Sequence, residues 1–292
     1  MNEKIKLITD SCCDIPQEIA EKYGIEILSF PITVDGKEYR ERVDFSAEEF
    51  YTMLTEAAKI PTHAQLIPIE FEDVYEKAYQ EGYTDLIYVS INSKGSSTYI
   101  NSKIAMNNFF DTHPNAKDSF HFHLIDSGCY TMGYGMAIIE AAKKIRRGLT
   151  VKEIVSSIED WINHVRILFV PLTLEFAKKS GRISAAAGFV GELLGLKPII
   201  TFEDGDSVIL EKVRGEKAVV PRLVEMVQKN IIPETPYSIV HGMQPQLTEE
   251  LTAEMEKKFG KASYVYPLGP VVAINAGPNV VGIIYKSHEH DQ

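Results

Sequence analysis

The sequence predicts an α/β protein of two domains: a three-layer α/β/α domain with a parallel sheet, then a domain with a mixed sheet. The chain has 292 residues, which is long for a single hydrophobic core. In the first half, short apolar runs alternate with helical patterns, the order typical of a parallel sheet covered by helices. In the second half, consecutive strand-like runs are joined by turns. We place the boundary near residue 164, so the domains span residues 1–164 and 165–292.

The first half carries two specific local signals. Asp35-Gly36 is a dipeptide typical of a hairpin turn, and Ser46-Ala47-Glu48-Glu49 is a capping box that starts a helix. Apolar runs predict strands at residues 5–9, 25–34, 85–91 and 120–125. Helical patterns predict helices at residues 16–23, 46–58, 71–80, 98–110 and 132–147.

The second half repeats these signals in a different order. Thr150-Val151-Lys152-Glu153 is a second capping pattern, and it starts the helix that carries Trp161. Asp204-Gly205-Asp206 predicts a hairpin turn between two strands. We expect strands at residues 166–172, 197–202, 208–213, 237–241, 263–266, 271–274 and 280–285, with a helix at 217–229 and one more among the later strands.

Composition excludes several classes of function. The chain has 30 Lys and Arg against 41 Asp and Glu, a net charge of -11, which disfavours nucleic acid and anionic membrane surfaces. No apolar run approaches the roughly 20 residues of a membrane span, and the first residues lead directly into a strand, so we expect no signal peptide. Cys12, Cys13 and Cys129 form no disulfide framework and lack zinc-ligand spacing, so we expect buried thiols, no metal and a cytoplasmic location.

The loop at residues 91–99 is the first candidate site. It follows a buried-strand pattern and precedes a helical one, so its serines and its backbone N–H groups are expected at a helix N-terminus, which favours an anion. No Walker lysine and no glycine fingerprint is present, so a small anion such as a carboxylate fits better than a nucleotide. The alternative is that these serines only cap the helix.

Other polar residues are expected at the same edge. Thr9-Asp10-Ser11 and Asp126-Ser127 follow two further strands, and ligands of parallel sheets bind beyond the carboxyl ends of the strands. Pro61-Thr62-His63-Ala64-Gln65 is a polar linker between two predicted helices. The alternative is that each segment is an ordinary turn or helix cap.

The sequence favours a binding protein over an enzyme. It contains no Gly-x-Ser-x-Gly elbow and no His-Glu-x-x-His motif, and His63 is the only histidine in a candidate loop. We therefore expect no catalytic residues and no metal ligands. Two alternatives stay open: an acyl hydrolase with Ser96 as nucleophile and His63 as base, and a module that binds another small acid without a partner protein.

The second domain adds three weaker signals. Gly181 follows a helical pattern that ends in two lysines, which predicts a helix C-terminus or, alternatively, a surface for a partner. The apolar stretch at residues 185–196 suits either the wall of a tunnel or a buried helix. Glycines such as Gly277 near the C-terminal end allow close approach of backbone to a ligand, although turns also use them.

The chain resembles the DegV family of bacterial fatty-acid-binding proteins. The resemblance covers nearly the whole chain, and it lies in the order of eight short motifs. They are Thr9-Asp10-Ser11, Pro61-Thr62-x-x-Gln65, Ser93-x-x-Ser96-x-Thr98-Tyr99, Asp126-Ser127, Gly181-Arg182-Ile183-Ser184, Lys197-Pro198-Ile199, Arg214-x-x-Lys217-Ala218 and Gly277-Pro278.

The resemblance implies one long-chain fatty acid (palmitate, stearate or oleate) between two α/β domains, and no other cofactor. It implies that Thr62 and Ser96 bond the carboxylate. The rest of the implied ligand-binding set is His63, Ser93, Ser97, Asn275 and Gly277, and the implied partner-facing residues are Arg182 and Arg214. Some members of the family serve as the acyl-binding subunit of a fatty acid kinase whose other subunit binds ATP.

Several positions depart from the family pattern. His63 and Ala64 stand where Thr and Ser are usual, and Ser97 stands where Gly is usual. Asn275 replaces the histidine of the usual His-x-Gly-Pro-Gly segment, and Asn279 replaces its last glycine. The resemblance therefore predicts lipid binding more strongly than partnership with a kinase.

Overall fold

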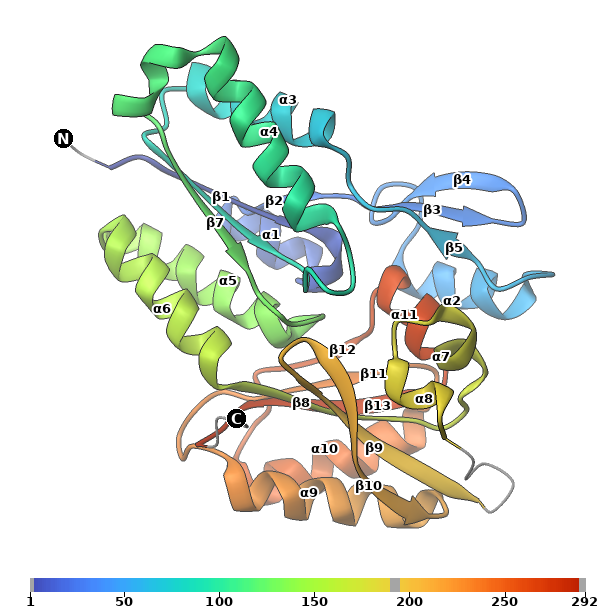
Figure 1. Ribbon diagram of the computed structural model, residues 1–292. Coiled ribbons are helices and arrows are strands. Elements are labelled where there is room, and N and C mark those ends of the chain that lie inside the picture. The colour runs from blue at the N-terminus through green and yellow to red at the C-terminus, as the bar shows by residue number, and fades with distance from the viewer. Residues whose placement is uncertain (1–2, 190–194, 289–292) are drawn as a thin grey trace. The chain divides into compact units, whose positions relative to one another are not determined.

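The computed structural model describes residues 3–189 and 195–288 (Figure 1). The chain divides into two compact units, and both are α/β, as predicted. The first unit comprises residues 1–32, 39–43 and 63–162, and the second comprises residues 33–38, 44–62 and 163–292. Residues 33–38 and 44–62 thus group with the second unit, whereas the sequence-based boundary at residue 164 places them in the first.

The first unit is built on a parallel sheet. Its strands are β1 (Ile5–Asp10), β2 (Glu26–Leu28), β6 (Asp85–Ser90) and β7 (His121–Asp126), in the order β2-β1-β6-β7. All three strand pairs are parallel. Every residue of the central strand β6 is buried, as expected of a parallel strand covered on both faces. The predicted parallel sheet is confirmed.

Helices cover both faces of this sheet, so the predicted three-layer arrangement is confirmed. Figure 1 shows α3 and α4 on one face and α1, α5 and α6 on the other. Their bounds are α1 (Gln17–Tyr23), α3 (Pro68–Gln80), α4 (Thr98–Thr112), α5 (Met132–Arg146) and α6 (Val151–His164). The predicted capping pattern of α6 is present, since Thr150 N donates to Glu153 Oε2 at 2.8 Å.

A small sheet has the order β4-β3-β5, with β3 (Pro31–Val34), β4 (Lys37–Arg40) and β5 (Thr62–His63). The single strand predicted at residues 25–34 is therefore wrong, because it divides between β2 and β3. Phe30 N donates to Ser11 Oγ at 3.0 Å between the two strands, and the next residue, Pro31, has no N–H for a ladder. The predicted turn is confirmed, with positive φ at both Asp35 and Gly36.

The second unit contains a six-stranded mixed sheet, as predicted. Its order is β10-β9-β8-β13-β11-β12, and only the pair of β11 and β12 is parallel. The strands are β8 (Val165–Pro171), β9 (Leu196–Glu203), β10 (Asp206–Arg214), β11 (Ser238–His241), β12 (Tyr264–Pro267) and β13 (Val280–Lys286). Figure 1 shows α9 (Val219–Asn230) and α10 (Pro245–Phe259) together on one face, where they bury a shared apolar core.

Among its described residues, the second unit also contains four other α-helices: α2 (Ala47–Glu56), α7 (Glu175–Ser180), α8 (Ser184–Ala187) and α11 (Pro270–Ala276). The predicted capping box starts α2, since Glu49 N donates to Ser46 Oγ at 3.2 Å and Ser46 N to Glu49 Oε2 at 2.8 Å. Gly181 ends α7 in the left-handed conformation, as predicted. Of the predicted apolar stretch 185–196, residues 190–194 lie outside the described residues.

The strand predicted at residues 271–274 is wrong, because these residues lie in α11. Pro270 occupies the first turn of this helix, where its missing N–H costs nothing and its fixed φ suits the helix. Ala273 N donates to Gly269 O at 2.9 Å, and Gly277 N donates to Ala273 O at 2.8 Å. The β-branched residues of this run pack inward from a helix instead of a strand.

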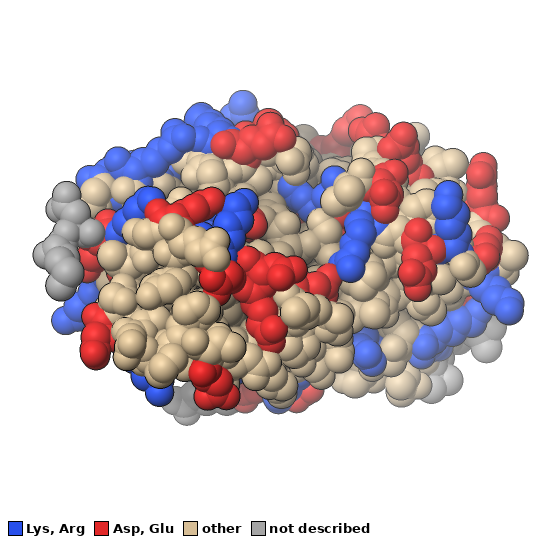
Figure 2. Space-filling view, turned by 90° about the horizontal axis from the view of Figure 1, so that it is seen from above, with Lys and Arg blue, Asp and Glu red and all other residues tan. Residues whose placement is uncertain are grey.

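The three cysteines are free thiols and buried, as expected. Burial raises the pKa of Cys129 to about 12 and that of Cys12 well above its ordinary value. Over residues 3–189 and 195–288, no helix has the length and apolar character to cross a membrane, and no cluster of three or more His, Cys, Asp and Glu could hold a metal ion. On the face shown in Figure 2, acidic residues lie at several separate places with basic residues between them.

Candidate functional site

The carboxyl ends of β1, β6 and β7 meet at one edge of the parallel sheet. In the strand register Thr9 lies beside Val89, and Ser90 lies beside Asp126. The loop at residues 91–98 leaves β6, the central strand of these three, so it stands between Asp10 and Asp126. The structure thus brings these strand-end segments together within the first unit.

Asp10 is a fully buried carboxylate that binds four donors. Its Oδ1 accepts from Tyr134 OH at 2.6 Å and from Cys12 N at 3.2 Å, and its Oδ2 accepts from Tyr88 OH at 3.1 Å and from Ile91 N at 2.9 Å. Burial raises the pKa of Asp10 to about 6, although the four hydrogen bonds oppose this rise. Asp10 therefore fixes the start of the loop and does not face a ligand.

Asp126 holds the loop from the other side. Its Oδ1 accepts from Ser93 N at 3.0 Å and from Gly128 N at 3.1 Å. Asn92 N donates to Cys129 O at 3.0 Å, a second bond between this loop and the loop that follows β7. The loop is therefore bonded through its backbone to the ends of both strands that flank β6.

Most backbone N–H groups of the loop are used within the protein. Lys94 N donates to Asn92 Oδ1 at 3.0 Å, and Gly95 N and Ser96 N donate to Asn92 O at 3.0 and 3.2 Å. The expectation that the loop at residues 91–99 offers free backbone N–H groups to an anion is therefore wrong for residues 91–96. An asparagine side chain and a tight turn satisfy these groups instead.

Serine hydroxyls remain as the donors of this loop. The Ser93 and Ser97 hydroxyls have no protein hydrogen-bond partner in the part of the chain that the structure describes, whereas Ser96 Oγ lies 2.8 Å from Thr98 Oγ1 and accepts from Thr98 N at 3.3 Å. Ser93 and Ser96 are half-buried, and Ser97 is exposed. Ser97 precedes α4 without a capping bond, so the capping alternative applies to Ser96 alone.

Gly95 lies close to the Tyr130 side chain, which leaves no room for a larger residue. A Cβ atom there would lie 2.4 Å from the Tyr130 hydroxyl oxygen, far below van der Waals contact. That hydroxyl accepts a hydrogen bond from Asn92 Nδ2 at 3.0 Å. The loop therefore lies directly on the aromatic side chain that follows β7.

The segment that begins at β5 joins the same site through α4. Leu66 N donates to Thr98 Oγ1 at 3.3 Å, and Leu66 O accepts from Asn101 Nδ2 at 2.7 Å. His63 is half-buried with its ring edge-on to Phe30 at a centroid distance of 6.4 Å. The first turn of α4 thus binds both the serine loop and the segment that follows His63.

The hydrolase alternative receives no support from this geometry. A serine nucleophile needs its base within hydrogen-bond reach. Within the described residues, the hydrogen bonds of the Ser96 hydroxyl both go to Thr98 and not to His63.

The other site candidates all belong to the second unit. They are Asn275, Gly277, Arg182, Arg214 and the exposed Thr62. Asn275 in α11 donates from Nδ2 to Val271 O at 2.7 Å. Gly277 has φ 88°, a backbone conformation that favours glycine, and a Cβ there would make a tight contact of 3.2 Å with Phe176 Cδ2. Arg182 and Arg214 are exposed.

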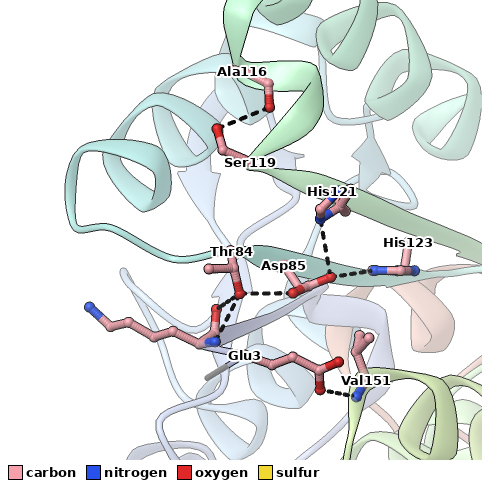
Figure 3. A network of polar contacts seen from close by, with 9 residues as sticks. Glu3, Thr84, Asp85, Ala116, Ser119, His121, His123 and Val151 are labelled. Atoms are coloured by element: carbon pink, nitrogen blue, oxygen red, sulfur yellow. Dashed lines mark hydrogen bonds and ion pairs between the residues drawn. The ribbon is translucent and has the colours of Figure 1, made fainter. Parts of the chain in front are cut away.

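A second polar cluster lies at the opposite edge of the parallel sheet, where β6 and β7 begin. Figure 3 shows the Asp85 carboxylate pointing toward both His121 and His123: its Oδ1 lies 2.9 Å from His123 Nε2 and 3.7 Å from His121 Nδ1. Its Oδ2 accepts from Thr84 Oγ1 at 2.8 Å. This cluster ties the strand starts together.

Comparison with known proteins identifies the family. A family model described as an uncharacterised protein of the DegV family matches residues 4–288. The chain belongs to the DegV family. A DegV domain-containing protein of Clostridium perfringens is 33% identical over 283 residues, which cover 96% of this chain and 98% of that protein.

Solved structures share the fold. A fatty acid binding DegV family protein from Streptococcus agalactiae is similar with a TM-score of 0.86 and 26% identity, over 98% of this chain and 100% of the other. A stearic acid-binding protein from Eubacterium ventriosum is similar with a TM-score of 0.84 and 23% identity, over 97% of this chain and 98% of the other. The DegV resemblance and the two-domain α/β fold are thus confirmed.

Sequence reasoning missed the residues that position the loop. Asp10 and Thr98 stand in motifs that the sequence singles out, but their roles depend on partners far along the chain. The partners of Asp10 include Tyr134, 124 residues away, and those of Thr98 include Leu66, 32 residues away. A buried-strand pattern containing a tyrosine, as at Tyr88, is the one local sign that a polar group must be satisfied inside.

Proposed function

We propose that this chain binds a long-chain fatty acid, with its carboxylate on the hydroxyls of Ser93, Ser96, Ser97 and Thr62 and on His63. The observation that carries the proposal is the serine loop. Its serines supply hydroxyl donors next to a helix N-terminus that has no acidic residue in its first turn. The solved relatives bind fatty acids by their descriptions, which supports an acyl ligand for this chain too.

The chemistry of such a ligand fits these donors. Each buried methylene contributes about 0.8 kcal/mol, so an acyl chain the length of palmitate, stearate or oleate supplies most of the affinity. Neutral hydroxyls hold the carboxylate without the bidentate grip of an arginine, which suits a ligand that must leave again. The proposal includes an acyl tunnel formed by residues 165–292 with residues 1–164, with Asn275 and Gly277 among its ligand-binding residues.

The test is the lipid content of the purified protein. Burial of a whole acyl chain slows dissociation, so we expect fatty acid to survive purification and to appear in an organic extract analysed by mass spectrometry. Delipidated protein should then take up palmitate or oleate. Protein that carries no fatty acid and takes up only short acids such as butyrate would show a small-acid module instead.

A finer part of the proposal concerns a partner. The family resemblance implies that some members serve a kinase, and we propose the exposed Arg182 and Arg214 as the residues that contact an ATP-binding kinase subunit. Asn275 already donates to Val271 O and cannot carry a proton as a histidine can. We therefore expect this chain to bind fatty acid but to support acyl-phosphate formation poorly.

The experiment for this part measures acyl-phosphate formation with a fatty acid kinase subunit. Asn275→His should raise the rate several-fold at unchanged palmitate affinity. Asn279→Gly restores the other family residue nearby and serves as the matched control, with no expected gain. Full activity of the unmodified chain would show that Asn275 is no obstacle.

A further inference from the structure

Thr98 is a fully buried residue that contacts Ser96 twice. The two hydroxyl oxygens are 2.8 Å apart, and Thr98 N donates to Ser96 Oγ at 3.3 Å. Thr98 Oγ1 also accepts a hydrogen bond from Leu66 N at 3.3 Å. Thr98 thus lies between the serine loop and the segment that follows His63.

The direction of the hydroxyl–hydroxyl bond follows from the other contacts. A hydroxyl has one proton to donate and two lone pairs to accept. If Ser96 donated to Thr98, the buried Thr98 proton would have no acceptor among the described residues, which is costly. If Thr98 donates to Ser96, this proton is satisfied, and the half-buried Ser96 keeps its own proton to donate outward.

In the second arrangement Ser96 Oγ accepts two hydrogen bonds, one from Thr98 N–H and one from Thr98 O–H. Its remaining capacity is therefore as a donor. We propose that Thr98 is a positioning residue that makes Ser96 a dedicated donor to an anionic head group, so that the site prefers a carboxylate over a neutral alcohol. This inference rests on the proposed function, because it assigns a specificity to the same site.

The chain of contacts also strengthens the final donor. Leu66 N–H, Thr98 O–H and Ser96 O–H form a series in which each bond polarises the next. Asn101 fixes the start of the series, because its Nδ2 donates to Leu66 O at 2.7 Å. The direction of the Ser96 proton is therefore set before a ligand arrives.

The test compares palmitate with 1-hexadecanol, which has the same chain length and a neutral head. Affinities are measured on delipidated protein for Thr98→Val, Thr98→Ser, Ser96→Ala and the double variant Ser96→Ala with Thr98→Val. Bonds to charged acceptors are the stronger ones, so Thr98→Val should weaken palmitate binding about 5- to 20-fold and hexadecanol binding less than about 2-fold. Thr98→Ser keeps the hydroxyl and should retain palmitate affinity.

The double variant separates positioning from general structure. If Thr98 acts through Ser96, adding Thr98→Val to Ser96→Ala should cost less than about 2-fold more. Ser102→Ala is the matched control, since Ser102 is another fully buried hydroxyl of α4 and donates to Tyr99 O at 2.7 Å. This control should leave the ratio of the two affinities unchanged.

Several outcomes overturn the inference while leaving the proposed function intact. They are unchanged palmitate affinity in Thr98→Val, equal losses for both ligands, or a full additional loss in the double variant. If Thr98→Val does not fold, Thr98→Ala replaces it. Ser96→Ala alone must still weaken palmitate more than hexadecanol, and equal effects there refute the inference. Wild-type protein that binds neither ligand refutes the proposed function instead.

Discussion

The two edges of the parallel sheet both contain a buried carboxylate, but the partners of that carboxylate differ. At the amino edge, Asp85 binds Thr84 and His123, which lie beside the starts of the strands. At the carboxyl edge, Asp10 binds Ile91 N and Tyr134 OH, which lie in a loop and a helix. The first carboxylate joins strand to strand, whereas the second holds a loop whose serine hydroxyls stay available.

This difference explains why polar residues at strand ends are a weak signal of function by themselves. At the carboxyl edge Thr9 donates to Val89 O at 2.8 Å, and Ser127 donates to Cys129 O at 3.3 Å. Such residues support the site and do not face a ligand. Among polar strand-end residues, the candidates for ligand contact are those whose hydrogen-bonding groups the protein leaves unused.

The largest expected effect comes from Asp10→Asn. Asparagine can accept at only one end of its side chain, so two of the four donors around Asp10 lose their acceptor. Each buried unpaired donor costs roughly 1–3 kcal/mol. We expect a loss of that order per donor in the free energy of unfolding at pH 7, measured by urea denaturation, and weaker palmitate binding. Asp85→Asn at the other edge should not weaken palmitate binding.

The same variant should flatten the pH dependence of stability. Because the folded protein raises the pKa of Asp10 from 3.8 to about 6, protonated Asp10 stabilises the fold. This contribution is complete below pH about 4 and is lost as the pH rises through about 6; it amounts to about 3 kcal/mol. The destabilisation caused by Asp10→Asn should therefore be larger at pH 4.5 than at pH 7.5. An equal difference at both pH values would contradict the raised pKa.

Substitutions at the carboxyl edge should weaken palmitate binding, whereas a substitution at the amino edge should not. Ser96→Ala should weaken palmitate binding by roughly 1.5–3 kcal/mol, the range for a hydrogen bond to a charged group, and Thr62→Val should act in the same direction. His123→Gln at the amino edge should leave affinity unchanged, while thermal unfolding reports any general loss of structure. If His123→Gln weakened palmitate as much as Ser96→Ala, the distinction between the two edges would fail.

Local chemistry predicted a large part of the fold. The capping box at Ser46 and Glu49 and the turn at Asp35-Gly36 are short-range signals, and the structure contains both. The alternating pattern of the first half was sufficient for the parallel sheet, because buried parallel strands are continuous apolar runs. The serine loop was found because it follows one such run.

The errors have two causes: local signals that were overlooked, and contacts between residues that are distant in the sequence. The apolar residues 271–274 have high strand propensity, but Gly269-Pro270 starts a helix there, a signal that the sequence does contain. Asn92 accepts from the N–H groups of Lys94, Gly95 and Ser96. These are the local bonds of an asparagine turn, so this signal too was present in the sequence. The pairing of Thr98 with Leu66, by contrast, depends on the packing of α3 against α4.

The way the chain divides has a consequence for its synthesis. Helix α2 belongs to the second unit, and Tyr51 OH donates to Leu268 O, 217 residues later in the chain, at 3.1 Å. The ribosome therefore releases α2 long before its partner exists, and contacts at such separations form late. A fragment that starts at residue 165 would lack α2, so the surface of α11 that α2 covers would be exposed to water. Neither unit is one continuous stretch of chain, so production of the second unit alone would require residues 33–38 and 44–62 to be supplied with it.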